Sequence, residues 1–164
     1  MDVVMLVGHG GPARDTPRPM VRELKVLESR RKPGTPMSRV EAELDAKVRG
    51  WPRTPDTDPY KFGLERLAEV LRPRVAPAEL RIAYNEFCAP SIEDAVATAV
   101  ADGATTITFV TTMFTPGGSH AEEEIPAVID ALSGRFPEVE LTYAWPFDLD
   151  RCADLLAGAV VAAR

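Results

Sequence analysis

The chain has 164 residues, enough for one domain with a hydrophobic core and too few for two ordinary domains. Hydrophobic residues make up 45% and charged residues 27%, as in globular domains, and a net charge of −6 argues against nucleic-acid binding. No apolar run reaches the roughly 20 residues of a membrane span and the N-terminus has no signal-peptide pattern, which predicts a cytoplasmic protein without a membrane segment.

The spacing of apolar residues predicts strands that alternate with helices along most of the chain. In chain order we expect a strand at 2–7, helices at 19–31, 38–49 and 64–71, a strand at 80–87, a helix at 90–102, a strand at 105–113, a helix at 119–133, a strand at 139–145 and a helix at 149–163. This alternation predicts an α/β fold with an open, parallel, four-stranded sheet and helices on both faces. We expect a single domain over 1–164, with a proline-rich helical insertion at about 32–60 after the first helix.

Two sequence patterns predict where helices begin. Ser38 with Glu41, and Ser119 with Glu122, each have the spacing of a capping box. The second pattern places His120 in the first turn of a helix, where the helix dipole favours a neutral imidazole. Pro126 cannot donate a backbone hydrogen bond, so this helix is expected either to begin nearer position 123 or to bend in its first turns.

Candidate reactive residues follow three of the predicted strands. His9 lies in a glycine-rich loop after the first strand, Glu86 ends the second, and His120 follows the third. Because the carboxyl ends of parallel strands meet at one edge of the sheet, we expect these side chains to share a cleft. The two histidines are the only ones in the chain, and a neutral imidazole is a good metal ligand. Glu124, four positions after His120, is a further candidate to attract a cation or accept a proton.

Glycines and basic residues near these positions predict contacts with a ligand. Gly10, Gly117 and Gly118 flank the histidines and would let the backbone approach a ligand closely. Between Arg14 and Lys32 the chain carries seven basic residues against three acidic ones, which suits a small polyanionic ligand or simply forms a solvated helix face. Cys88 and Cys152 are far apart in sequence and are expected to be free thiols.

Three ordered motifs resemble the class II chelatases of the sirohydrochlorin chelatase (CbiX-like) family. They are LVGHG at 6–10, RIAYNEFCAPSIEDAV at 81–96 and PGGSHAEEEIP at 116–126. The resemblance covers residues 1–15 and about 80–164. Ser119, which lies between the glycines and His120, and the insertion at about 32–60 depart from the family pattern.

The resemblance implies a metal chelatase that inserts Co²⁺, Fe²⁺ or Ni²⁺ into a sirohydrochlorin-like tetrapyrrole, without a nucleotide. It implies that His9 and His120 bind the metal and take up pyrrole protons, assisted by Glu86 and Glu124. Arg14 and the basic segment after it would face the acidic side chains of the macrocycle. By analogy with two-lobed relatives, a homodimer would complete the cleft.

Two other functions remain open on the sequence alone. A carrier that binds a metal or a tetrapyrrole without turnover would need the same pocket. An esterase would use the Gly-Gly-Ser-His-Ala segment at 117–121 as a nucleophile elbow, but the catalytic histidine of that fold follows its serine and acid, and no histidine follows position 120.

Overall fold

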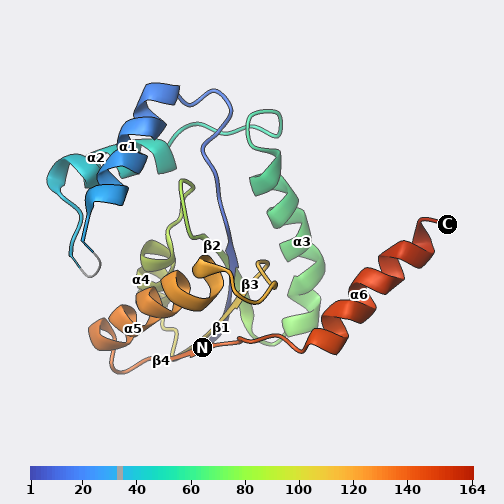
Figure 1. The fold of residues 1–164 in the computed structure, drawn as a ribbon. Coiled ribbons are helices and arrows are strands. Elements are labelled where there is room, and N and C mark those ends of the chain that lie inside the picture. Colours follow the sequence, from blue (N-terminus) through green and yellow to red (C-terminus); the bar gives the residue numbers. More distant parts are fainter. Residues whose placement is uncertain (33–34) are drawn as a thin grey trace.

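The computed structural model describes residues 1–32 and 35–164 and consists of one sheet with helices around it (Figure 1). The four parallel strands lie in the order β2-β1-β3-β4. The elements are β1 (Asp2–Gly8), α1 (Arg18–Arg30), α2 (Arg39–Arg49), α3 (Pro59–Val75), β2 (Glu79–Tyr84), α4 (Ile92–Ala101), β3 (Thr106–Thr111), the π-helical turn η1 (His120–Glu124), α5 (Ile125–Arg135), β4 (Glu140–Tyr143) and α6 (Leu149–Ala162). The predicted α/β fold is confirmed. Pro33, one proline of the predicted insertion, lies outside the described residues.

Apolar side chains cover both faces of the central strand β1. On one face, Val3, Met5 and Val7 pack with α4 and α5 in the larger core cluster. On the other face, Leu6 packs against Leu64 of α3. Burial on both sides explains why β1 is an uninterrupted apolar run rather than an alternating one.

The helices α1 and α2 cover neither face of the sheet. They pack on each other and on the loop after β2 through the buried side chains of Leu24, Val48 and Phe87. Figure 1 shows the pair beyond the end of β1 opposite the N-terminus, which is the carboxyl edge of the sheet. The insertion therefore stands over the edge where the sequence predicts the site.

Two predicted boundaries differ from the structure. The second strand was expected to reach position 87 but ends at Tyr84, because the chain turns at Phe87, whose φ of 53° is in the left-handed region. Asn85 and Glu86 thus lie in a loop. The helix expected from position 64 already begins at Pro59, because the Asp58 side chain caps it by accepting a hydrogen bond from the backbone of Lys61.

The last helix, α6, is formed as predicted but does not cover the sheet. None of its residues is buried, and Figure 1 shows it projecting from the body of the molecule. At its base lies an apolar groove of about 660 Å³ between α3 and the ends of β3 and β4. In the described part of the chain, no helix is long and apolar enough to cross a membrane.

Candidate functional site

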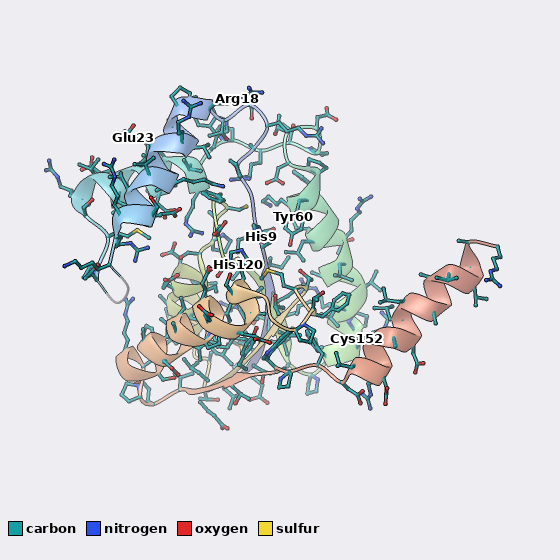
Figure 2. The ribbon with its side chains drawn as sticks, viewed as in Figure 1. His9, Arg18, Glu23, Tyr60, His120 and Cys152 are labelled. Atoms are coloured by element: carbon teal, nitrogen blue, oxygen red, sulfur yellow. The ribbon has the colours of Figure 1, made fainter. Side chains whose placement is uncertain are left out.

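Three predicted site residues meet at the carboxyl edge of the sheet. His9 follows β1, Glu86 follows β2, and His120 opens η1 after β3; a ligand atom from each lies within 4.8 Å of the other two. The histidine rings are edge to face, with centroids 4.6 Å apart and planes at 87° (Figure 2). Three ligands at about 2.1 Å from one metal ion lie at most about 4.2 Å apart, so small side-chain rotations would close this group on an ion.

The His9 ring is held so that one nitrogen stays free. Its Nδ1 lies 2.5 Å from the carbonyl oxygen of Gly10, which can only accept a hydrogen bond, so Nδ1 carries the proton. The backbone N–H of His9 donates to the Tyr60 hydroxyl at 2.8 Å, and Figure 2 shows these two residues beside each other. The Nε2 of His9 is therefore left as a potential metal ligand.

The His120 ring is oriented in the same way by a carboxylate. Its Nδ1 lies 2.8 Å from Oε2 of Glu124, and the Asn85 side-chain amide donates to the same oxygen at 2.9 Å. The Asn85 amide nitrogen also lies 3.1 Å from this Nδ1. Because an ionised carboxylate can only accept, we assign the Nδ1 proton to the shorter contact with Glu124, which leaves Nε2 free, as is common around metal-ligating histidines. Glu124, expected as a metal ligand, thus binds His120 in this conformation, and Glu86 completes the three-residue group.

The pKa of Glu124 reflects these contacts. Partial burial raises the pKa of this carboxyl, but the hydrogen bonds from Asn85 and His120, together with the nearby histidine charges, outweigh burial and leave the pKa below its ordinary value of 4.5. The carboxylate is therefore ionised at neutral pH, as an acceptor for the Nδ1 proton of His120 must be.

The expected capping box at Ser119 is wrong. The Ser119 side chain makes no capping bond, and the Glu122 carboxylate instead accepts from the backbone N–H of Gly117 at 2.9 Å. From His120 the chain forms a π-helical turn, in which the N–H of Ile125 bonds the carbonyl of His120. Pro126 lacks an N–H, which accounts for the altered first turn that the sequence predicted.

Gly10 allows the loops that carry His9 and Glu86 to touch. The backbone N–H of Glu86 donates to the carbonyl of His9 at 2.9 Å, and Gly10 has a φ of 83°. A Cβ at Gly10 would lie 2.0 Å from the Glu86 carbonyl oxygen. The observed role of Gly10 is therefore to let the two loops pack closely. Ligand binding by Gly10, and by the exposed Gly117 and Gly118, stays a prediction.

A cavity of about 530 Å³ adjoins the site and is rich in carboxylates. Its acidic lining residues are Glu28, Glu86, Glu93, Glu123 and Glu124. Burial raises the pKa of the Glu28 carboxyl, and the negative charges of Glu86, Asp45 and Glu41 raise it further. Arg31 and Arg49 also line it, but each is paired with a carboxylate, and the excess of acidic groups would attract divalent cations to the neighbourhood of the histidines.

The predicted basic surface is only partly available to a ligand. Arg14 is exposed, and its guanidinium donates to the carbonyl of Asp56 at 3.2 Å. Arg31 forms an ion pair at 2.9 Å with the buried carboxylate of Glu41. Figure 2 shows Arg18 on α1, well away from the histidine pair. Binding of a ligand by Arg14 stays a prediction.

Sequence reasoning missed Glu28 and the part played by Tyr60. Glu28 looked like one more charge on a basic helix, and only the placement of α1 over the sheet edge brings it to the cavity. The Tyr60 hydroxyl holds the backbone of His9, a contact between segments 51 positions apart. Neither contact has a local signal in the sequence.

Replacing Glu124 with glutamine should weaken metal binding without unfolding the protein. A neutral amide accepts the Nδ1 proton less strongly, and loss of such a partner typically costs 10–100-fold in metal affinity. Isothermal titration with Co²⁺ would measure the change, with the exposed Asp130→Asn on α5 as a matched control. Equal Co²⁺ affinity for wild type and Glu124→Gln would contradict the orienting role.

Similar proteins were found by sequence. The family model described as CbiX matches residues 58–159, a range that contains Glu86, His120 and Glu124 but not His9. The chain is 33% identical over 76 residues to a sirohydrochlorin ferrochelatase of Priestia megaterium. That alignment spans 46% of this chain and 28% of the ferrochelatase, so the chain covers well under half the length of this relative.

Similar folds were found among solved structures. A CbiX protein from Marinobacter aquaeolei VT8 has a TM-score of 0.60 at 19% identity, over 99% of this chain and 97% of that one. The sirohydrochlorin chelatase SirB from Bacillus subtilis subspecies spizizenii, in complex with cobalt, has a TM-score of 0.54 at 21% identity, over 88% of this chain and 43% of SirB. At such identities these structures support the fold alone, while the family model matches more than half of the sequence. The chain therefore belongs to the CbiX family.

Proposed function

We propose that the protein inserts a divalent metal ion, Co²⁺, Fe²⁺ or Ni²⁺, into a sirohydrochlorin-like tetrapyrrole without using a nucleotide. The observation that carries the proposal is the pair of histidines whose Nε2 atoms are both free beside the carboxylate of Glu86. Family membership and the names of the relatives, sirohydrochlorin ferrochelatase and sirohydrochlorin chelatase, support this substrate class.

The geometry fits a metal that is bound briefly and passed on. Three protein ligands leave coordination positions open, where the pyrrole nitrogens of the macrocycle can replace the protein ligands one at a time. The carboxylates that line the neighbouring cavity would bring the cation to the histidines.

The same residues can take up the protons that the macrocycle loses. When the metal leaves His9 and His120, each Nε2 becomes a free base that can accept a pyrrole proton. The resulting imidazolium of His120 is stabilised by the Glu124 carboxylate on Nδ1, and that of His9 by the carbonyl of Gly10. Arg14 would face an acidic side chain of the macrocycle at the rim of the site.

The test is metal insertion by the purified protein. Sirohydrochlorin is incubated with Co²⁺, Fe²⁺ or Ni²⁺ in turn, and the absorbance change on metallation is followed against a protein-free reaction. A rate above that blank with at least one metal is expected. Binding of the metal and the macrocycle without accelerated metallation would overturn the catalytic proposal and favour a carrier.

We also propose that two copies associate through α6. The exposed side chains of Leu155, Leu156, Val160 and Val161 leave this helix without an apolar partner, and the groove at its base is mostly apolar. Two such copies can exchange these surfaces across a two-fold axis, each α6 lying in the groove of the other copy. The SirB chains that match are more than twice as long as the part that this chain spans, so a second copy would supply a second lobe.

Light scattering on the protein as it elutes from a size-exclusion column tests this association. We expect a dimer mass for the wild type and a monomer for Leu156→Asp, because a charge in an apolar interface is left unpaired. Asp154→Asn, a neighbouring exposed change on the same helix, is the matched control and should remain dimeric. A wild type that is monomeric at high concentration would contradict the proposal.

A further inference from the structure

The arginine at the end of α2 binds the loop that carries Glu86. The guanidinium of Arg49 donates to the carbonyl of Cys88 at 2.9 Å, to that of Asn85 at 3.1 Å and to that of Tyr84 at 3.4 Å. Its Nε donates to the Asp45 carboxylate at 2.8 Å, one turn earlier on α2. One side chain of the insertion therefore contacts both ends of the 84–88 segment.

A second arginine of the insertion joins this loop to the one that carries His9. The guanidinium of Arg53 donates to the carbonyl of Gly11 at 2.8 Å and also to the carbonyl of Phe87. It forms an ion pair with Asp58, and the side chains of both partners are almost fully buried. The hydroxyl of Tyr60, at the end of the insertion, holds the backbone N–H of His9.

These contacts leave Arg49 little capacity to bind a substrate anion. A guanidinium has five N–H groups, and four hydrogen bonds to protein oxygens already engage Arg49. The accepting groups are mainly carbonyls of a loop that lies outside the regular sheet and turns at Phe87 with a φ of 53°. A planar, rigid donor suits several carbonyls at once, which a single ammonium group does not.

We propose that Arg49 is a positioning residue, and that with Arg53 it makes the proline-rich insertion a frame that holds the Glu86 and His9 loops at metal-binding distance. The inference rests on the proposed function for its chemistry. It assigns a role to a segment that stands over the sheet edge and contributes no ligand to the His9, Glu86 and His120 group. The frame acts through the loop backbones, because both arginines contact carbonyls rather than the metal ligands themselves.

The experiment compares Arg49→Met and Arg49→Lys with Arg39→Met in the full chain. Arg39 lies on the same helix, is 90% exposed and pairs only weakly with Glu43, at 3.6 Å, so its substitution is a matched control. Titration with Co²⁺ alone, followed by the visible absorption of the bound ion, gives the dissociation constant. We expect the constant to rise about 10-fold or more for Arg49→Met, less for Arg49→Lys, and under twofold for Arg39→Met.

Hydrogen exchange of the peptide that covers residues 84–88 gives a second readout, independent of the metal. Exchange should speed up in both Arg49 variants and stay unchanged in Arg39→Met, since Arg49 donates to the carbonyls of Tyr84, Asn85 and Cys88 whereas Arg39 pairs with Glu43. Arg49 variants that lose thermal stability but bind Co²⁺ within twofold of wild type would show a merely structural role and overturn the inference.

The two proposals fail in different ways. Wild-type protein that binds Co²⁺ but never metallates sirohydrochlorin would overturn the proposed function, while a weakened Co²⁺ site in Arg49→Met would still support the frame. Wild-type protein that does not bind Co²⁺ at all would overturn both.

Discussion

Replacing either His9 or His120 with alanine is expected to reduce metal insertion about 100-fold or more. Each histidine supplies one of three clustered ligands, and the loss of a direct ligand costs more than the 10–100-fold typical of an outer partner. Each also supplies an Nε2 base that would accept a pyrrole proton. A single substitution therefore removes both a metal ligand and a base. Initial rates with Co²⁺ and sirohydrochlorin measure the effect.

Folding of these variants has to be checked beside the rates. Both rings are partly exposed, so alanine should leave the far-ultraviolet circular dichroism and the cooperativity of unfolding close to wild type. Ser119→Ala, next to His120 and without a capping bond, is a control that should insert metal normally. A folded variant with wild-type rates would remove that histidine from the mechanism.

Replacing Gly10 with alanine should destabilise the protein by about 3 kcal/mol or more. The residue has a φ of 83°, which costs a non-glycine residue about 1–2 kcal/mol. The added Cβ would also lie 2.0 Å from a backbone oxygen of Glu86, and backbone cannot give way as cheaply as a flexible side chain. Urea denaturation at neutral pH measures the free energy of unfolding.

Gly103→Ala separates the two causes. Gly103 has a similar φ of 93°, but nothing lies within 4 Å of a Cβ built there. Its substitution should cost only the strain of the backbone conformation, about 1–2 kcal/mol. Equal losses of stability for the two variants would mean that contact between the His9 and Glu86 loops contributes little.

The fold and the clustering of the three candidate site residues could be predicted because the strands and helices follow local sequence patterns. The spacing of apolar residues and the positions of turn residues indicated the strands and helices. The parallel topology then placed His9, Glu86 and His120 at one edge of the sheet. The Ser38 cap was predicted correctly and is present, with its side chain accepting from the backbone of Glu41. These features need no knowledge of how distant segments pack.

What the sequence did not reveal depends on contacts between distant segments. Nothing local distinguishes Arg49, which reaches three carbonyls of another loop, from Arg39 on the same helix. The failed cap at Ser119 has a local cause instead, since the chain forms a π-helical turn from His120 to Glu124, just before Pro126. The projection of α6 could not be foreseen either, because its apolar pattern equally suits a helix that packs on its own sheet.

The edge-to-face histidine pair has a consequence for the order of events during folding. His9 and His120 are separated by 111 positions (120 − 9), and each follows a different strand of one parallel sheet. Parallel pairing across such a separation forms late, because the long intervening loop must close first. A partly folded chain would therefore present two separate imidazoles, and the group of His9, Glu86 and His120 would assemble only with the native sheet.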